Sequence, residues 1–366
     1  MKRILIKAHG IIPQNGGYIA GIGRTNIELI RRFAAIKDNE IEFSIYCPTR
    51  QSIGFAHYGW DIKYHAYPFP HDILLKSNFE SIYRRTFFKH DVFHITGNID
   101  NFVKKERPIV TIHDLFMKNK ENAWLFDKCV NKSRAIVTCS DFTKQDILDN
   151  YPGIDEDKIT VIPWGIDHEM FRPRESVDIS RLRKLFGIKE RYFFACSCNN
   201  PRKNVDVILK SFSKFCEFKN DVSLVLTWKN PPENILCQYA REIESKKIIF
   251  LPYVDDDDLA TLYSGTVASI FVSSFEGFGF PILESMACGT PVITCHNTSL
   301  SEIGTNLAVY VKEKDVDDLV EYMTAFYNGE ILFTPSELIS HAKSYNWDDT
   351  ANKYIDFYKK TLYKEL

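Results

Sequence analysis

The feature that most constrains this chain is a repeated alternation of short apolar runs with longer segments of helical period. The runs are continuous in β-branched and aromatic residues, which is typical of parallel strands covered by helices on both faces. The first series comprises Arg3–Ala8, Ile41–Cys47, Val92–Ile95, Ile109–Ile112, Ala135–Cys139 and Ile159–Pro163. Strands that alternate with helices in this way predict a doubly wound α/β domain.

The same pattern restarts after a polar, proline-containing stretch at residues 171–178. The second series comprises Tyr192–Ser197, Ser223–Trp228, Lys247–Tyr253, Ala268–Ser273, Pro291–Cys295 and Leu307–Val311. A chain of 366 residues is about two to three times the usual length of a domain, so two domains are expected. We place them at residues 1–172 and 173–345, followed by an amphipathic helix over residues 346–366.

Charge is distributed unevenly along the chain. Residues 1–150 carry 22 basic and 16 acidic side chains, whereas the remainder carries 24 and 32. A basic first half suits an anionic partner such as a lipid phosphate or a membrane leaflet, and simple solvation of surface charge explains it equally well. No nucleic acid is expected as a partner.

Several classes of protein are excluded by what the sequence lacks. No run approaches the roughly 18–20 apolar residues that span a bilayer, and Met1 leads into a strand-like run instead of a signal peptide, so a cytoplasmic location is expected. None of the nine cysteines forms a C-x-x-C pair with zinc spacing, so Cys196, Cys198 and the others are interpreted as small buried hydrophobes. The acidic run Asp255–Asp258 precedes a helical stretch and is interpreted as capping and solvation, not as a metal site.

The most informative stretch is Ser273–Thr294, SSFEGFGFPILESMACGTPVIT, which indicates a strand, a glycine-rich loop, a helix and another strand. Gly277 and Gly279 allow the backbone to approach a ligand closely, and the start of the helix directs free N–H groups toward an anion. Glu276 is expected at the loop mouth and Glu284 in the first helical turn, where carboxylates can accept hydrogen bonds from diols. The pattern predicts a cradle for a phosphate or a sugar.

Two cations follow an earlier strand of the same domain. The segment Pro201-Arg202-Lys203-Asn204 comes after the strand that ends near Ser197 and opens a helix at Val205. Open α/β sheets bind ligands at the carboxyl ends of their strands, so Arg202 and Lys203 could neutralise a diphosphate. The alternative interpretation of the same segment is a solvated basic turn.

Two features of the first half are chemically less specific. Gly16-Gly17 and Gly21-Ile22-Gly23 lie between the first strand and a helix expected to begin near Asn26, but the third glycine of a dinucleotide-binding fingerprint is absent, so NAD or FAD binding is not expected. His113 and Asp114 end a strand at the edge where a cleft would lie. A lone histidine is usually structural, and this one could equally be functional.

The order of these motifs resembles glycosyltransferase family 4, whose members are retaining, nucleotide-sugar-dependent enzymes. The similarity is collinear over residues 1–350 and is carried by AGIGRTN (20–26), TIHDL (111–115), VTCSDFTKQDI (137–147), VIPWGID (161–167), PRKN (201–204), VDDDDLATLY (254–263) and E-x7-E (276–284). The resemblance implies a GT-B fold, in which two doubly wound Rossmann-like domains face a central cleft. The first would be the acceptor side, with the final helix packing back on it, and the second would bind the nucleotide sugar.

The resemblance also implies roles for the glycine-rich loop and its two carboxylates. Glu276 would bind hydroxyl groups of the donor sugar, and Glu284 would hold the nucleotide ribose. Backbone N–H groups around the sugar and phosphate would come from Gly277, Phe278, Gly279 and Phe280.

The remaining implied roles concern the leaving group and the reacting face. Lys203, helped by Arg202, would stabilise the diphosphate, and Gly23 would let the first loop approach the same phosphates. His113 would lie beside the donor sugar, so that His113, Glu276 and Lys203 form the expected catalytic group. Since cations and the helix start could supply the charge at the diphosphate, no metal or other cofactor is expected.

The chain departs from the family pattern in two places. Many relatives carry a further arginine about six residues before the lysine, where this chain has Ser197 and where Arg202 could substitute. The segment Trp228-Lys229-Asn230 lacks a usual glycine, which leaves recognition of the donor base open.

The EGFGFP and PRKN forms resemble mannosyltransferases. The leading hypothesis is therefore transfer of a hexose from GDP-mannose to a lipid-diphosphate-linked or oligosaccharide acceptor in bacterial surface polysaccharide synthesis. A UDP-sugar donor and a non-catalytic sugar-nucleotide-binding subunit stay open as alternatives. The acceptor would lie against the basic first domain, where Arg84, Arg85 and Lys89 could meet an anionic membrane at its inner face or form a solvated helix face.

Overall fold

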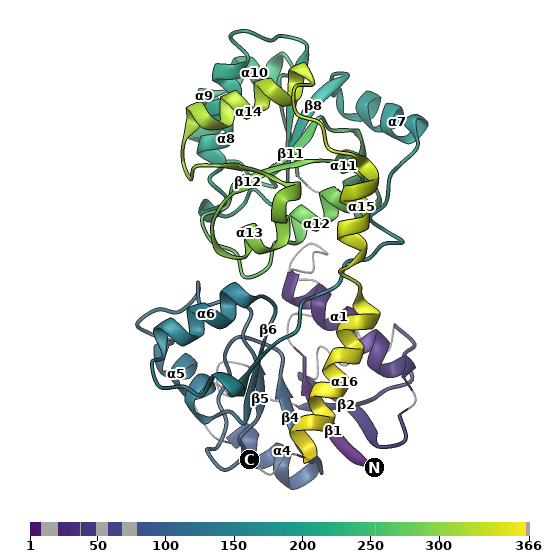
Figure 1. The fold of residues 1–366 in the computed structure, drawn as a ribbon, viewed down its shortest axis with the longest axis vertical. Helices are drawn as coiled ribbons and strands as arrows, with labels where there is room; N and C mark the ends of the chain where they lie inside the picture. The colour runs from purple at the N-terminus through teal and green to yellow at the C-terminus, as the bar shows by residue number, and fades with distance from the viewer. Residues whose placement is uncertain (9–20, 37, 49–57, 68–78, 253, 364–366) are drawn as a thin grey trace. The chain divides into compact units, whose positions relative to one another are not determined.

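The computed structural model describes residues 1–8, 21–36, 38–48, 58–67, 79–252 and 254–363. The chain divides into two compact units (Figure 1). Unit 1 comprises Met1–Gly165 with Trp347–Leu366, and unit 2 comprises Ile166–Asn346. The boundary therefore lies between Gly165 and Ile166, before the expected position at residue 172, and the final helix belongs to unit 1.

Unit 1 is built on a seven-stranded parallel sheet with the strand order β3-β2-β1-β4-β5-β6-β7. The strands are β1 (Lys2–Lys7), β2 (Ile41–Pro48), β3 (Lys63–Tyr67), β4 (Val92–Ile95), β5 (Ile109–Thr111), β6 (Ala135–Thr138) and β7 (Ile159–Val161). Six of them correspond to the predicted apolar runs. The exception is β3, which lies at the edge of the sheet with Lys63 and Tyr64 exposed, so no continuous apolar run marks it.

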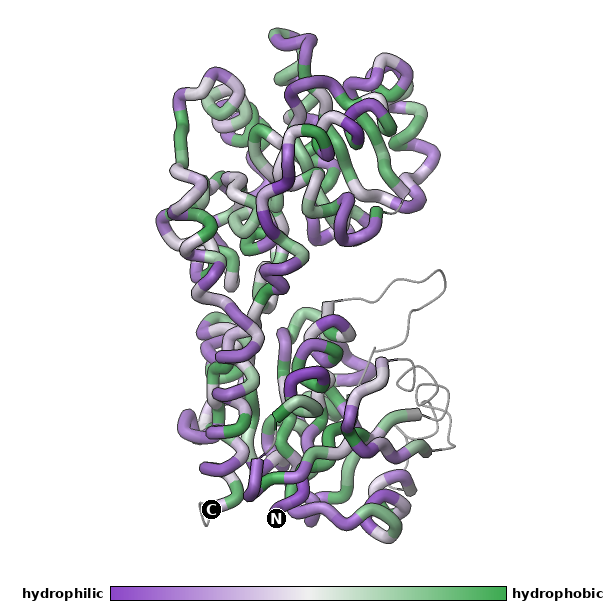
Figure 2. Tube along the Cα trace, turned by 90° about the vertical axis from the view of Figure 1, so that its right-hand side faces the viewer, coloured by the Kyte–Doolittle hydropathy of each residue, from purple (hydrophilic) through white to green (hydrophobic). Residues whose placement is uncertain are grey.

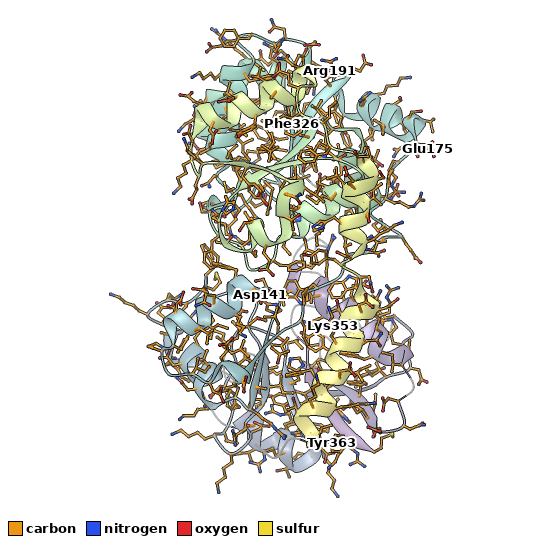
Figure 3. The ribbon with its side chains drawn as sticks, viewed as in Figure 1. Asp141, Glu175, Arg191, Phe326, Lys353 and Tyr363 are labelled. Carbon is orange, nitrogen blue, oxygen red and sulfur yellow. The ribbon has the colours of Figure 1, made fainter. Side chains whose placement is uncertain are left out.

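Helices cover both faces of this sheet. They are α1 (Gly21–Ala35), α4 (Phe79–Phe87), α5 (Ala123–Lys132), α6 (Asp141–Asn150) and α16 (Trp347–Tyr363). Side chains at odd and even positions of β2 point to opposite faces of the sheet. On one face, Phe43 stacks on Phe33 of α1 with ring centroids 4.5 Å apart. On the other face, Tyr46 packs on Phe88, which follows α4. Figure 3 shows Asp141 at the start of α6 and Lys353 on α16.

Unit 2 contains a six-stranded parallel sheet with the order β10-β9-β8-β11-β12-β13. Its strands are β8 (Arg191–Ala195), β9 (Val222–Thr227), β10 (Ile248–Leu251), β11 (Ala268–Phe271), β12 (Val292–Cys295) and β13 (Val309–Val311). Its helices are α7 (Ser176–Phe186), α8 (Val205–Phe215), α9 (Glu233–Gln238), α10 (Ala240–Glu244), α11 (Asp256–Gly265), α12 (Phe280–Ala287), α13 (Thr298–Gly304), α14 (Val316–Asn328) and α15 (Pro335–Lys343). Hydrophobic and hydrophilic segments alternate along the tube of each unit in Figure 2. The strands of both sheets contribute many of the buried hydrophobic residues, as sheets covered on both faces require.

The acidic run Asp255–Asp258 caps a helix. Asp255 is the N-cap of α11, and its carboxylate accepts a hydrogen bond from the backbone N–H of Asp258 at 2.8 Å. The next three aspartates occupy the first turn, where the helix dipole favours negative charge. The capping interpretation is therefore confirmed.

The cysteines behave as the composition suggested. Eight of the nine are buried and Cys237 is exposed. Within the described residues, no three His, Cys, Asp or Glu side chains are grouped so that they could hold a metal ion. In the same part of the chain, no helix combines the length and the apolar character needed to span a bilayer.

Arg84 corrects one prediction. It was expected on a basic surface with Arg85, but its side chain is fully buried, lies 3.5 Å from the ring centroid of Phe93, and pairs with Glu80 and with Glu106, the latter at 2.6 Å. The two carboxylates raise the pKa of Arg84 against the opposing effect of burial. Arg84 therefore stabilises the interior of unit 1 and cannot contact a membrane.

Candidate active site

The two loops that carry the predicted donor-binding residues meet at the centre of the unit 2 sheet. From β8 the chain runs outward through β9 to β10, then crosses to β11 on the other side of β8 and continues outward to β13. Open α/β sheets bind ligands at such a reversal of strand order, beyond the carboxyl ends of the strands. The PRKN segment follows β8 and the glycine-rich loop follows β11, so both lie at this point.

Asn204 holds the two loops together. It adopts a left-handed conformation, with φ 51° and ψ 42°, between the short 3₁₀ helix Pro201–Lys203 and the start of α8. Its side-chain amide donates to the carbonyl oxygen of Val272 at 2.8 Å and to the hydroxyl of Ser274 at 2.9 Å. The backbone N–H of Ser274 donates in turn to the carbonyl oxygen of Arg202 at 2.8 Å. The cations of one loop are thus fixed against the carboxylate of the other.

Lys203 and Glu276 form a buried ion pair where the loops meet. Lys203 Nζ lies 2.6 Å from Glu276 Oε1, and the two residues are only 9% and 8% exposed. Ser273 donates its hydroxyl to the same carboxylate oxygen at 2.7 Å, and Arg202 Nη1 lies 3.1 Å from the other one. Two cations therefore share one carboxylate, which leaves a net positive charge beside the glycine-rich loop.

The glycine-rich loop has a backbone conformation that few residues other than glycine adopt. Gly279 has φ 123°, and a Cβ atom there would lie 3.3 Å from Leu300 Cδ2. Ser299 donates its hydroxyl to the carbonyl oxygens of Glu276 and Phe278, at 2.9 and 2.6 Å. The carbonyl oxygen of Phe278 therefore faces Ser299, and the side chain of Phe278 is buried. Phe278 can offer a ligand only its backbone N–H group.

Glu284 lies in the second turn of α12, not in the first turn as expected, because the helix already begins at Phe280. This position is too far along the helix for Glu284 to act as a cap. Tyr263 of α11 places its hydroxyl 3.1 Å from Glu284 Oε2 and 3.1 Å from Cys196 Sγ. Burial, together with Cys196 and Glu284, raises the pKa of Tyr263, so its hydroxyl keeps its proton and can orient the carboxylate.

His113 follows β5 in unit 1 and is held rigidly. Its Nε2 lies 2.8 Å from the carbonyl oxygen of Thr96, so Nε2 carries the proton, and in a neutral ring Nδ1 is the acceptor. Its backbone N–H donates to Asn98 Oδ1 at 2.6 Å, and its ring centroid lies 5.0 Å from that of Trp164. The imidazole is 3% exposed and has one fixed orientation and tautomer.

Gly23 is buried within the first turn of α1, which begins at Gly21 and not near Asn26 as expected. The first four N–H groups of a helix have no partner within it, so Gly23 belongs to a segment that can donate to an anion. The predicted Gly16 and Gly17 lie outside the described residues.

Two family models match almost the whole chain. The model described as Glycosyltransferase Family 4 matches residues 19–170, and the model described as Glycosyl transferases group 1 matches residues 178–346. This chain belongs to the family 4 glycosyltransferases. The resemblance seen in the motifs is therefore confirmed.

Similar sequences include bacterial mannosyltransferases. The glycosyltransferase is 27% identical over 271 residues to the O-antigen chain mannosyltransferase B of Escherichia coli, a match that covers 69% of this chain and 70% of that protein. It is 27% identical over 242 residues to the serotype-specific mannosyltransferase WbdA of Escherichia coli, but this match covers 63% of the chain and only 29% of that much longer protein.

Solved structures identify the fold. A glycosyltransferase from Rickettsia africae superposes with a TM-score of 0.77 over 100% of this chain and 99% of that one, at 18% identity. The two doubly wound Rossmann-like units therefore have the GT-B fold, as the sequence predicted.

Sequence reasoning missed two side chains of the glycosyltransferase site. Ser273 ends the strand run before the E-x7-E motif, and Tyr263 ends the VDDDDLATLY block, so each lay within a segment already singled out. Neither residue carries a local sequence signal that marks it as part of the site. Only the structure shows that each of them contacts one of the two glutamates.

Proposed function

We propose that this glycosyltransferase moves a hexose from a nucleotide diphosphate sugar, preferentially GDP-mannose, to a lipid-linked or oligosaccharide acceptor in bacterial surface polysaccharide synthesis, with retention at the anomeric carbon. The observation that carries the proposal is the pairing of Lys203 and Arg202 with Glu276 beside the glycine-rich loop. The similarity to O-antigen mannosyltransferases supports mannose as the sugar and a polysaccharide as the product.

The chemistry requires stabilisation of a leaving diphosphate. The bond between the anomeric carbon and the phosphate oxygen breaks, and its electron pair stays on the nucleoside diphosphate. Lys203, Arg202 and the N–H groups at the start of α12 would bind that charge without a metal ion. The acceptor hydroxyl would attack from the same face and pass its proton to the leaving phosphate oxygen.

Glu276 and Glu284 would position the donor. When the diphosphate binds Lys203, Glu276 can exchange that cation for hydroxyl groups of the sugar, because a carboxylate accepts several hydrogen bonds. Glu284, oriented by Tyr263, would accept from the ribose diol. His113 would lie beside the sugar, with its orientation fixed by Thr96.

A thermal-shift screen with chelator present tests the donor and the metal together. The purified protein is compared with Lys203→Ala, Glu284→Ala and the control Lys210→Ala, an exposed cation on α8, in UDP, GDP, dTDP and their sugars. A shift with GDP that only the first two variants abolish supports the proposal, because a ligand stabilises the state it binds. A shift with UDP alone would mean that the donor is a UDP-sugar and not GDP-mannose. If the donor binds but a separate transfer assay detects no turnover with any acceptor, the result would favour a non-catalytic subunit.

Proton NMR of the product formed from an α-linked donor tests retention directly. We expect an α-linked product from the first observable turnover onward. A β-linked product would contradict retention.

The location remains a prediction. We expect the enzyme in the cytoplasm, at the inner face of the membrane when its acceptor is a lipid. With Arg84 buried, only Arg85 and Lys89 of the predicted basic group are exposed. Binding to anionic vesicles that survives Arg85→Glu with Lys89→Glu would exclude this group as the membrane contact.

A further inference from the structure

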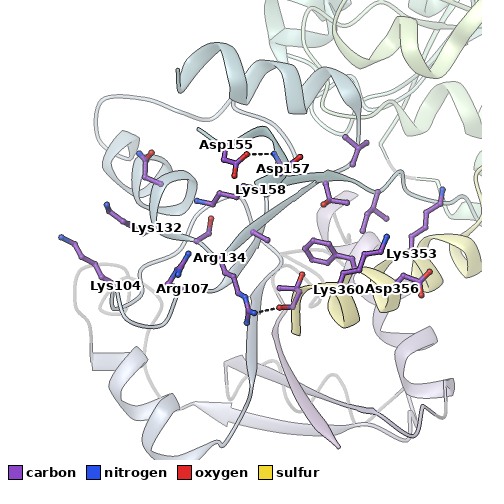
Figure 4. A pocket seen from close by; sticks show the side chains of 18 residues that line it. Lys104, Arg107, Lys132, Arg134, Asp155, Asp157, Lys158, Lys353, Asp356 and Lys360 are labelled. Carbon is purple, nitrogen blue, oxygen red and sulfur yellow. Dashed lines mark hydrogen bonds between the residues drawn. The ribbon is translucent and has the colours of Figure 1, made fainter. Parts of the chain in front are cut away.

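Unit 1 contains a cavity of about 780 Å³ near the edge of the sheet where β5, β6 and β7 begin (Figure 4). Three of its lining residues come just before these strands: Arg107 before β5, Arg134 before β6 and Lys158 before β7. Lys360 of α16 lines another side. Because the strands are parallel, His113, which follows β5, lies toward the opposite edge of the sheet. The cavity is therefore separate from the candidate active-site residues of unit 1.

Cations dominate the lining of this cavity. Seven Lys and Arg side chains line it, against three Asp side chains. Two of the cations are half-buried and are held by neutral backbone groups: Lys158 donates to the carbonyl oxygen of Val130 at 2.5 Å, and Arg134 donates to that of Thr361 (Figure 4). Asp155 is engaged in its own turn, where its carboxylate accepts from the backbone N–H of Asp157 at 3.0 Å.

The cations of the cavity also repel one another. Burial, together with the charges of Arg107 and Lys132, lowers the pKa of Lys158 to about 8 against the opposing effect of Asp155. Burial and Arg107 likewise lower the pKa of Arg134. A cluster in which positive charges disfavour each other gains most from an anion that several of them can bind at once.

Arg107 is placed by an uncommon backbone conformation. Its φ is 43°, in the left-handed region, although it is not a glycine and precedes Pro108. Such a conformation persists only where the surrounding structure imposes it. Arg107, which has this conformation, is also the residue whose charge lowers the pKa of both Lys158 and Arg134.

We propose that this cavity binds a phosphate-bearing anion, either a soluble phosphate or the headgroup of a lipid. The donor set favours phosphate, since guanidinium and ammonium groups together offer many charge-assisted N–H bonds to its oxygens. The apolar part of the lining, which includes Ile162 and Phe357, gives room for the organic group that the phosphate carries. The site would tether or regulate the enzyme from the side of unit 1 away from catalysis.

Two binding assays on the full-length protein test this inference and distinguish the two sources. Pyrophosphate is titrated calorimetrically in a Lys203→Ala background, which removes the proposed diphosphate cation of unit 2. Sedimentation with vesicles of phosphatidylcholine, with and without phosphatidylglycerol, measures lipid binding of the otherwise unchanged protein. Each assay compares the double variant Arg107→Gln/Lys158→Gln with Lys105→Gln, an exposed cation that does not line the cavity.

We expect the double variant to weaken binding at least tenfold in one of the two assays, while Lys105→Gln leaves it unchanged. Loss of pyrophosphate binding identifies a soluble phosphate, and loss confined to the anionic vesicles identifies a lipid headgroup. Equal binding by both variants in both assays, or no binding by the parent proteins, overturns the proposal. If the double variant unfolds, Lys132→Gln/Lys360→Gln replaces it, because both side chains are exposed.

Discussion

Lys203 Nζ lies 2.6 Å from Glu276 Oε1, so the cation expected to bind the diphosphate is already paired with the carboxylate expected to bind the sugar. Both groups are almost fully buried, and Arg202 adds a second cation at 3.1 Å. A charged pair of this kind holds each partner in place. Donor binding must then redistribute these contacts, which makes the pair sensitive to removal of either charge.

Glu276→Gln is expected to change binding and turnover in opposite directions. Without the carboxylate charge, Lys203 and Arg202 attract a diphosphate more strongly, by about 1 kcal/mol or roughly fivefold in Kd. Turnover should fall by about 100-fold, because the sugar loses a charged hydrogen-bond acceptor at the reacting centre. Calorimetry with the nucleoside diphosphate and a transfer assay measure the two effects.

Glu190→Gln is the matched control, because Glu190 is an exposed carboxylate of the same unit. Weaker nucleotide binding by Glu276→Gln than by this control would show that the carboxylate does not oppose the diphosphate.

Tyr263→Phe should raise KM for the donor without a comparable loss of kcat. The hydroxyl lies 3.1 Å from Glu284 Oε2, and removing one such hydrogen bond costs about 1 kcal/mol, or roughly fivefold in KM. Steady-state kinetics with varied donor separate the two constants.

Tyr192→Phe makes the same chemical change at another buried tyrosine of unit 2, whose hydroxyl donates to the carbonyl oxygen of Leu262 at 2.7 Å. It should lower stability to a similar degree and leave KM unchanged. Equal KM values for the two variants would mean that Tyr263 has only a structural role.

Gly279→Ala is expected to destabilise unit 2 and to weaken donor binding. At φ 123° an alanine is strained, which costs about 1–3 kcal/mol, and its Cβ would lie 3.3 Å from Leu300 Cδ2. A shift of the loop would misdirect the N–H groups at the start of α12. Denaturant unfolding and nucleotide titration measure the two consequences.

Gly329→Ala separates backbone strain from the effect on the site. Gly329 also has a positive φ, 72°, but a Cβ atom there would have no neighbour within 4 Å. It should reduce stability alone. If Gly279→Ala binds nucleotide as tightly as Gly329→Ala, the loop does not contribute to the donor site.

The sheets were predictable because their signal is local. A strand that is buried on both faces must be mainly apolar, and twelve of the strands coincide with apolar runs that the sequence shows. The edge strand β3 escapes the rule, since Lys63 and Tyr64 face solvent. The loops carrying Lys203 and Glu276 were found for the same reason, as they follow central strands whose ends are easily recognised.

Arg84 could not be assigned from sequence, because its burial depends on distant partners. Glu106 lies 22 residues away along the chain and Phe93 lies on another element, so the local pattern resembled a solvated basic helix. The pairing of Lys203 with Glu276, 73 residues apart, was hidden in the same way. Sequence located both loops but not the contact between them.

His94 makes the stability of unit 1 depend on pH. It is fully buried, with Nδ1 2.6 Å from the hydroxyl of Tyr358 and Nε2 2.8 Å from that of Thr111. Burial, with a smaller effect of His113, lowers the pKa of His94 to about 3, well below the value of about 6.5 in an unfolded chain. The folded state therefore keeps the ring neutral in the range where the unfolded state binds a proton.

This difference in proton binding determines how the free energy of unfolding changes with pH. The stability contributed by neutral His94 is fully present above about pH 6.5 and is lost as the pH falls toward 3, by about 1.4 kcal/mol per pH unit. Between pH 7.5 and 5, the loss should be about 2 kcal/mol. His94→Gln, which cannot titrate, should show a smaller fall over the same range when unfolding is measured with denaturant. If the free energy of unfolding falls equally with pH in the two proteins, His94 does not stay neutral in the folded chain.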